Sequence, residues 1–349
     1  MNINPNSPIL VTGGSGYIAS WVISLLLKKG HTVHTTVRNI SKRENYSHLL
    51  ELEDAQNEKL KIFEADLMKE GSFAEAMNDC ELVIHTASPF VVQGIEDPEK
   101  ELIEPALKGT ENILNSVNQN QGVKRVVLTS SVAAIFSDNK DILSIPGGKF
   151  TEEHWNTKSS LEHNPYSYSK TLAEKKAHEM VKAQNRWDLV VINPGFVLGP
   201  SLSKRTDSTS VRTVLQLCDG TFFLGVPELY FGVVDVRDVA LAHILAGFQP
   251  SASGRHILCK ETLPLMEISD HIKKKFPGKF LNPLLVVPYF LIWIVAPILG
   301  FTHKYIEENI GCSFQVDNTK SIQELGIAYT DFSKTIEDHI LQLQRDKLL

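Results

Sequence analysis

The chain has 349 residues, of which 42% are hydrophobic and 22% are charged, a profile typical of a folded globular protein rather than a disordered chain. Its 41 acidic residues outnumber its 35 lysines and arginines, and the formal net charge of −6 argues against a general nucleic-acid binder. Neither a zinc motif nor a disulfide framework is indicated by the four widely separated cysteines, which are Cys80, Cys218, Cys259 and Cys312.

Apolar runs typical of buried strands alternate with helical stretches over the first 200 residues. The strands are expected at residues 8–12, 31–37, 60–65, 82–86, 125–129 and 189–193. The helices are expected at residues 16–29 and roughly at 72–79, 98–119 and 166–184. This alternation predicts a doubly wound, parallel α/β sheet of the Rossmann type, covered by helices on both faces.

The regular alternation fades after residue 200. We expect residues 1–200, with segments near 230–260, to form the domain built on this sheet, and residues 254–259 to add one late strand to it. Residues 201–349 are expected to form mainly a smaller, discontinuous substrate-binding lobe of loops and helices.

A glycine-rich turn follows the first expected strand. Residues 12–19 read TGGSGYIA, so Gly13, Ser15 and Gly16 lie between a strand and the start of a helix. Glycines there let the backbone approach a pyrophosphate, whose negative charge the helix N-terminus stabilises. The pattern predicts dinucleotide binding; the alternative is a glycine turn without a ligand.

The end of the second strand distinguishes between the two nicotinamide cofactors. NAD binding would favour an acidic residue here, whereas this chain has Arg38, with Lys42 close behind. A guanidinium can bind a 2′-phosphate, so the sequence predicts NADPH; the alternative is a solvated basic loop. Asp66 and Leu67 follow the third strand, where Asp66 is placed to bind the adenine amino group.

The fifth strand ends in the hydroxyl residues Thr129, Ser130 and Ser131. Ligands of a doubly wound sheet bind outside the carboxyl ends of its strands, so these side chains are expected near the substrate. We predict that Ser131 donates a hydrogen bond to the substrate oxygen, with Ser130 as the alternative residue for this role.

Tyr166 and Lys170 are four residues apart, which places them on one face of the expected helix. A nearby ammonium favours the phenolate and lowers the pKa of a tyrosine, which would let Tyr166 exchange a proton with a carbonyl oxygen. Lys170 is also placed to bind the nicotinamide ribose. The alternative is an ordinary surface pair. Tyr168, with a leucine four residues on, lacks such a partner.

Residues 280–302 read FLNPLLVVPYFLIWIVAPILGFT and contain no charged residue. Their number meets the roughly 20 residues that a membrane span needs, but three prolines interrupt them. We expect a buried helix pair that forms the apolar wall of the substrate pocket, or a dimer surface. An interfacial membrane anchor and a true span are the less favoured alternatives.

The motifs together resemble those of the extended short-chain dehydrogenases/reductases, and within them the dihydroflavonol 4-reductase-like group. That group includes cinnamoyl-CoA reductase and the fungal NADPH-dependent carbonyl reductases that act on methylglyoxal and ketones. The motifs occur in one order: the glycine turn, HTASP at 85–89, TSS at 129–131, Tyr166 with Lys170, NPG at 193–195 and VDVRDVA at 234–240.

The resemblance implies roles for further residues. Backbone groups of Tyr17 and Ile18 would contact phosphate. The other implied cofactor contacts are Thr86, Ala87, Ser88, Thr129, Pro194, Gly195 and Val197. Plant flavonoid reductases carry an Asn or Gln in the loop after Ser131, where this chain has the apolar residues 132–136. This departure favours the fungal type, with apolar ketones or aldehydes as substrates.

The sequence thus predicts an NADPH-dependent oxidoreductase that reduces a small ketone or aldehyde with Ser131, Tyr166 and Lys170. One alternative is a nucleotide-sugar epimerase or a 3β-hydroxysteroid-type dehydrogenase, and another is a non-catalytic NADPH-sensing protein. We expect no metal and no nucleic-acid partner, a monomer or homodimer, and a cytoplasmic location, since the N-terminus has no secretory signal pattern.

Overall fold

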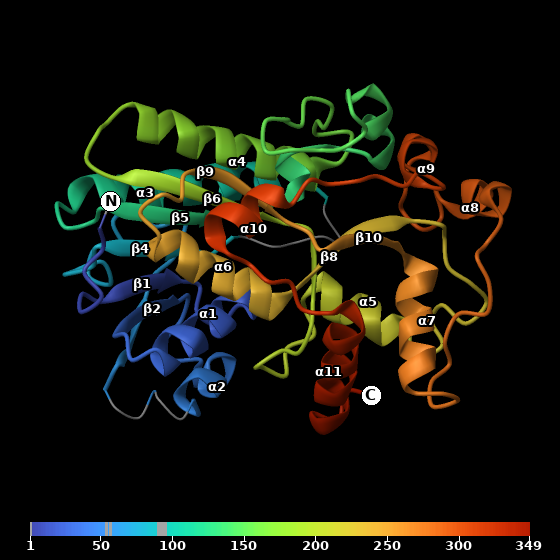
Figure 1. Ribbon diagram of the computed structural model, residues 1–349, viewed down its shortest axis with the longest axis horizontal. Coiled ribbons are helices and arrows are strands. Elements are labelled where there is room, and N and C mark those ends of the chain that lie inside the picture. The colour runs from blue at the N-terminus through green and yellow to red at the C-terminus, as the bar shows by residue number, and fades with distance from the viewer. Residues whose placement is uncertain (1, 53–54, 56–57, 89–95) are drawn as a thin grey trace.

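The computed structural model describes residues 2–52, 55, 58–88 and 96–349. Its central sheet has seven parallel strands in the order β3-β2-β1-β4-β5-β6-β9 (Figure 1). The strands are β1 (Ile9–Thr12), β2 (Val33–Val37), β3 (Leu60–Glu64), β4 (Leu82–His85), β5 (Arg125–Thr129), β6 (Asp188–Pro194) and β9 (Gly254–Leu258). The predicted doubly wound α/β fold is confirmed, with the late strand at the edge of the sheet.

Helices cover both faces of this sheet because successive strand residues point to opposite sides. Ile9 and Val11 of β1 pack in one hydrophobic cluster with α1 (Tyr17–Lys28) and α6 (Val236–Phe248). Leu10, between them, packs in a second cluster on the other face. The helices of that face are α3 (Glu104–Gln119) and α4 (Pro165–Lys182), and a π-helical turn, η3 (Glu99–Ile103), leads into α3.

The prediction of a helix at residues 72–79 is wrong, because the segment forms a succession of turns. Phe73 and Met77 are four residues apart, as on one face of a helix, and both are buried. Gly71 and Asp79 on either side have left-handed backbone conformations, with φ of 73° and 64°. So few residues remain between them that a helix cannot recover the cost of its nucleation.

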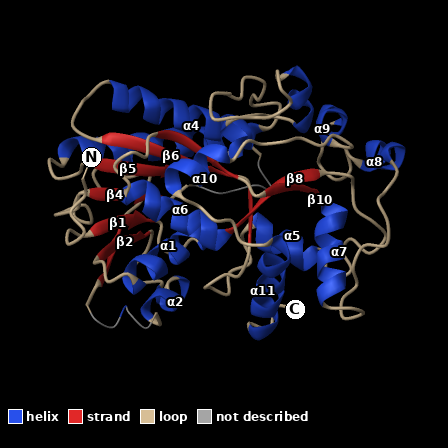
Figure 2. Cartoon of the chain, viewed as in Figure 1, coloured by secondary structure: helices blue, strands red, loops and turns tan. Residues whose placement is uncertain are grey.

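A second sheet, which the sequence did not indicate, follows residue 195. It has the order β10-β8-β7, with β7 (Phe196–Leu198), β8 (Tyr230–Asp235) and β10 (Glu261–Pro264). Figure 2 shows these strands apart from the central sheet. Strands of three to six residues are too short for a clear alternating pattern. The main helices around it are α5 (Thr209–Gln216), α7 (Leu265–Lys275) and α11 (Phe332–Arg345).

The shorter helices are α2 (Ser47–Leu50), α8 (Tyr289–Val295), α9 (His303–Asn309) and α10 (Thr319–Leu325). The apolar run at 280–302 contains α8 and is mostly exposed, so the expected buried helix pair is wrong. Of this run, Gly300, Phe301 and Thr302 line the large cavity described below. Among the described residues, no helix combines the length and the apolar character that crossing a membrane requires.

A buried arginine joins three elements at the amino ends of the central strands. Arg125, at the start of β5, is 1% exposed, and its Nε and Nη2 donate to the two carboxylate oxygens of Asp188 at 2.7 and 2.8 Å. Its Nη1 donates to the carbonyls of Ala246 and Gln249 at the end of α6, at 2.9 and 2.6 Å. The guanidinium therefore fixes β5, β6 and α6 relative to one another.

We expect Arg125→Ala to lower the free energy of unfolding by about 3 kcal/mol, because a carboxylate and two buried carbonyls lose their donor. The matched control is Lys108→Ala, which breaks an exposed pair with Glu104 on α3 and should change the stability by less than about 0.5 kcal/mol. Urea unfolding measures both. Equal small changes in the two variants would show that Arg125 does not hold these elements together.

Candidate functional site

A cavity of about 1420 Å³ opens at the carboxyl ends of the central strands. It runs from the glycine turn before α1, past the start of α4, to the second sheet and α9. This volume exceeds the roughly 300–1,000 Å³ of an ordinary single-ligand pocket, so the cavity has room for a cofactor and a substrate together.

The structure brings nearly all of the sequence-predicted site residues together around this cavity. The predicted residues that line it are Gly13, Ser15, Gly16, Tyr17, Ile18, Arg38, Lys42, Leu67, Thr86, Ala87, Ser88, Thr129, Ser131, Tyr166, Lys170, Pro194, Gly195 and Val197. Asp66 is not among them, and its carboxylate accepts a hydrogen bond from the Met68 amide at 2.8 Å. Its adenine contact stays a prediction, and Pro89 of the HTASP motif lies outside the described residues.

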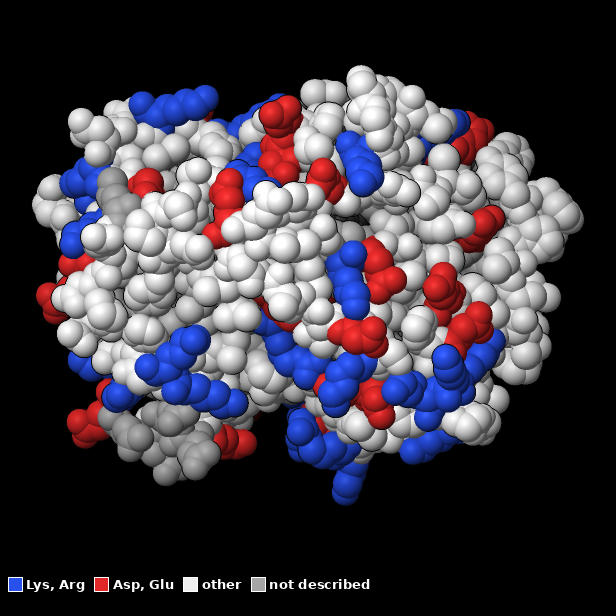
Figure 3. All heavy atoms as spheres, in the orientation of Figure 1, with Lys and Arg blue, Asp and Glu red and all other residues white. Residues whose placement is uncertain are grey.

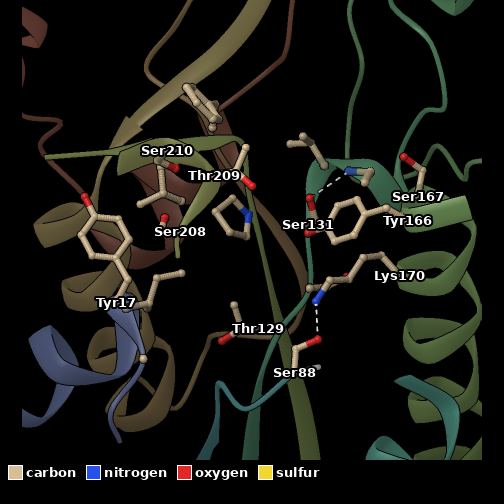
Figure 4. A pocket seen from close by; sticks show the side chains of 18 of the residues that line it. Tyr17, Ser88, Thr129, Ser131, Tyr166, Ser167, Lys170, Ser208, Thr209 and Ser210 are labelled. Atoms are coloured by element: carbon tan, nitrogen blue, oxygen red, sulfur yellow. Dashed lines mark hydrogen bonds between the residues drawn. The ribbon is translucent and has the colours of Figure 1, made fainter. Parts of the chain in front are cut away.

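Tyr166 and Lys170 project from the first turns of α4 toward the end of β5 (Figure 4). The amine of Lys170 lies 5.8 Å from the centre of the Tyr166 ring and donates to Ser88 Oγ at 2.9 Å. Ser131, which follows β5, faces the phenol, and its Oγ accepts from the Ala133 amide at 3.1 Å. Three hydroxyl groups and one amine thus meet at one end of the cavity.

Burial raises the pKa of Tyr166 to about 12, although a hydrogen bond with the Ser131 side chain acts in the opposite direction. The expected lowering of this pKa by Lys170 is therefore not the net effect in this arrangement. Desolvation has the largest effect on the pKa of Tyr166 and raises it, because a phenolate is less stable than a phenol away from water. At neutral pH Tyr166 carries its proton.

Burial lowers the pKa of Lys170 to about 8, and the negative charge of Glu174 opposes this change. Glu174 lies one turn further along α4 and is 1% exposed. The charge of Glu174 therefore favours the ammonium form of Lys170. The sequence analysis missed Glu174, although its spacing of four residues from Lys170 places it on the same face of the helix.

Glu174 is held by groups from three neighbouring strands. It forms an ion pair of 2.5 Å with Arg255 of β9, and it accepts hydrogen bonds from Ser130 and, at 2.7 Å, from Asn193 of β6. Burial alone would raise the pKa of Glu174, but hydrogen bonding and the Arg255 charge hold it below its ordinary value. Because the Ser130 hydroxyl donates to this carboxylate, Ser131 is the better placed of the two serines for substrate.

Arg255 is itself buried, and no sequence pattern indicated its role. Its Nη1 donates to the carbonyls of Glu152 and His154, and its guanidinium lies 3.9 Å from the centre of the Trp155 ring. These contacts fix the segment before α4. Residues 151–156, which read TEEHWN, are thus attached to the central sheet through the same arginine that pairs with Glu174.

The opposite end of the cavity fits a dinucleotide. A Cβ added at Gly13, where φ is 69°, would lie 3.0 Å from Ala87, and one at Gly14 would lie 2.2 Å from Thr35 Oγ1. Gly16 is the N-cap of α1 and makes no side-chain capping bond, and the first turn has no acidic residue. The turn therefore has the close backbone approach and the amide donors that a pyrophosphate requires. Arg38 and Lys42 line the cavity beside it.

Aromatic side chains form much of the cavity wall toward the second sheet. Those that line it are Phe136, Phe196, Tyr230, Phe231, Phe301, Tyr305 and Phe314. The wall also contains the apolar residues Val132 and Ala133 from the loop after Ser131. This composition suits the apolar part of a substrate whose polar group points at Tyr166 and Ser131.

Comparisons with known proteins agree with this architecture. Residues 10–271 match the 3-beta hydroxysteroid dehydrogenase/isomerase family. The chain is 39% identical to cinnamoyl-CoA reductase CAD2 of Medicago truncatula, over 99% of this chain and 98% of that protein. It resembles the structure of yeast methylglyoxal/isovaleraldehyde reductase Gre2 complexed with NADPH, with a TM-score of 0.77 and 28% identity over 98% of this chain and 100% of the other. It also resembles the structure of vestitone reductase from alfalfa (Medicago sativa), with a TM-score of 0.75 and 28% identity over 99% of this chain and 100% of the other.

We expect Glu174→Gln to lower the pKa of Lys170 below about 8, because the carboxylate that stabilises the ammonium is removed. The pKa is measured by competitive acetylation of amines across pH 6–10, read at Lys170 by mass spectrometry. The control is Glu179→Gln, on the same helix but paired with Lys176, which should leave this midpoint unchanged. An unchanged midpoint in a folded Glu174→Gln variant would contradict the electrostatic coupling.

Proposed function

Because this chain belongs to the 3-beta hydroxysteroid dehydrogenase/isomerase family, we propose that it is an NADPH-dependent reductase that converts a ketone or aldehyde into an alcohol. Membership of the extended short-chain dehydrogenases/reductases, predicted from the motifs, is confirmed. The observation that carries the proposal is that Ser131, Tyr166 and Lys170 lie together at one end of the cavity. The other end of the same cavity contains the glycine turn that fits a dinucleotide. Cinnamoyl-CoA reductase and the NADPH-bound Gre2 structure support the same activity.

The cofactor contacts follow from the lining residues. The amides of Ser15, Tyr17 and Ile18 would bind the pyrophosphate, since those of Gly13, Gly14 and Gly16 donate to acceptors within the protein. Arg38 with Lys42 would bind the 2′-phosphate. Ser88 and Lys170 would bind the ribose next to the nicotinamide. The remaining predicted contacts, Leu67, Thr86, Ala87, Thr129, Pro194, Gly195 and Val197, would pack along the cofactor.

NADPH, when bound, supplies the hydride. Tyr166 holds a proton at neutral pH and donates it to the substrate oxygen. Ser131 orients the phenol and donates a hydrogen bond to the same oxygen as negative charge develops on it. The ammonium of Lys170 stabilises the phenolate that remains, and Glu174 keeps that ammonium charged.

The aromatic wall favours an apolar or aromatic carbonyl substrate. We propose that residues 1–200, together with α6 and β9, form the cofactor-binding domain, and that β8 and the later segments shape the substrate end. A second candidate is a 3β-hydroxysteroid-type dehydrogenase, which the matched family and the size of the cavity favour. Assays that follow NADPH oxidation with aldehydes, ketones and methylglyoxal, and NADP⁺ reduction with 3β-hydroxysteroids, distinguish the two.

We expect Tyr166→Phe to lower kcat by about 10²- to 10⁴-fold, because the variant has no proton to donate. The dissociation constant for NADPH should change by less than about twofold. Tyr168→Phe is the control, since it removes a hydroxyl two residues away on the same helix and should keep kcat within about twofold. Full turnover in Tyr166→Phe would rule out this residue as the proton donor.

We expect Arg38→Ala to raise KM for NADPH by about 10- to 100-fold and KM for NADH by less than about twofold, because only NADPH carries the 2′-phosphate. Arg43→Ala, which removes a nearby arginine that does not line the cavity, should change neither constant by more than about twofold. Equal losses with both cofactors in Arg38→Ala would refute the 2′-phosphate assignment. Steady-state kinetics with each cofactor provides the measurement.

A further inference from the structure

One end of the molecule carries a large exposed apolar surface that the proposed reaction does not use. Thirteen of the twenty exposed large hydrophobic side chains in the described part of the chain lie between Leu281 and Phe301. We call the exposed side chains of these residues the apolar cap. Ile298 is 85% exposed, Leu299 66% and Phe290 62%. Soluble monomers rarely expose so many apolar side chains together unless the surface binds something.

The cap is built on α8, which only one face attaches to the rest of the protein. Ile292 and Ala296 are buried, and they form a small separate cluster with Ile306 of α9. The other faces of α8 are apolar as well, since its sequence is YFLIWIV. A surface helix normally turns charged or polar residues toward water, so this helix is not adapted to water on its free sides.

The cap contains no charged side chain, but lysines lie on both sides of it in the sequence. No charged residue occurs in 280–302, whereas Lys274, Lys275 and Lys279 precede this run and Lys304 follows it. The amine of Lys273 donates to the carbonyl of Pro283, which places this lysine-rich end of α7 beside the cap. Figure 3 shows the end of the molecule with α8 as largely uncharged. Apolar side chains bordered by lysines match the acyl chains and anionic headgroups of a lipid surface.

Two aromatic side chains of α8 also fit such a surface. Tyr289 is 46% exposed and Trp293 is 40% exposed, and Trp293 stacks on His303 at 3.9 Å between ring centres. Tyrosine and tryptophan are enriched where a membrane meets water, because each has an apolar body and a polar group. An interface between two protein copies would not by itself require the bordering lysines.

The cap is continuous with the wall of the catalytic cavity. Phe301 is 47% exposed, and it lines the cavity together with Gly300, Thr302 and Tyr305. The cap and the wall of the cavity therefore share Phe301.

We propose that the apolar cap docks on the surface of an anionic lipid bilayer without crossing it, and that apolar carbonyl substrates enter the cavity from the lipid. The entry of substrate rests on the proposed reductase function, whereas the docking does not. The cap residues insert among the headgroups, and Lys274, Lys279 and Lys304 contact lipid phosphates, whereas Lys273 and Lys275 pair with Asp270 and Glu337.

The test is sedimentation of the full-length protein with vesicles of phosphatidylcholine alone or with 30% phosphatidylserine. We expect binding to the anionic vesicles that falls at high salt, with a blue shift of tryptophan fluorescence. The double variant Ile298→Glu with Leu299→Glu should bind at least tenfold more weakly. The control Leu143→Glu changes a side chain that is 75% exposed and lies outside the cap, and it should bind like the unaltered protein.

Failure of the unaltered protein to bind anionic vesicles, or equal binding by the double variant, would overturn the proposal. So would a dimer in analytical ultracentrifugation that the double variant converts to a monomer with no vesicle binding, because the cap would then be an interface between copies. NADPH oxidation with a water-soluble aldehyde is measured in parallel and should be unchanged in the double variant. Vesicle binding without any reductase activity would contradict the proposed function but leave the docking intact.

Discussion

The buried charge of Glu174 is the constraint on which the end of the cavity with Tyr166 and Lys170 depends. A carboxylate that is 1% exposed needs compensating partners, and the chain supplies them from the ends of three adjacent strands, β5, β6 and β9. The ion pair with Arg255 and the hydrogen bonds from Ser130 and Asn193 fix α4 against the sheet. The positions of Tyr166 and Lys170 follow, because both project from the same helix.

Three side chains spaced four residues apart lie on one face of α4, and each has a different role. Tyr166, nearest the start of the helix, holds the proton, Lys170 supplies positive charge, and Glu174 keeps Lys170 charged. Burial acts on the first two in opposite senses, since it keeps a phenol neutral and also favours a neutral amine. The charge of Glu174 opposes the effect of burial on Lys170, so a residue one turn further along the helix influences the charge of the Tyr166–Lys170 pair.

Local patterns were sufficient for most of the central sheet and for both ends of the cavity. The glycine turn, Arg38, Ser131 and the Tyr166–Lys170 pair are short-range signals, and the topology of parallel strands brings their strand ends to one edge. Arg255 could not be found in this way, because it lies 81 residues after Glu174 in the chain. The pairing of β9 with β6 is what brings the two residues together. The three short strands of the second sheet likewise depend on pairing between distant segments.

The apolar run at 280–302 shows a different limit of sequence patterns. A stretch without charge indicates that its side chains avoid water, but it does not say whether protein or lipid replaces that water. The prolines Pro283, Pro288 and Pro297 interrupt the segment, and the helix that remains has seven residues, with one face packed on α9. The fold therefore separates two environments: a charge-compensated site held by Glu174, and an uncharged surface that meets the cavity at Phe301. The proposed reduction of an apolar carbonyl compound would use both, because apolar contacts would bind the substrate and a polar group would donate the proton.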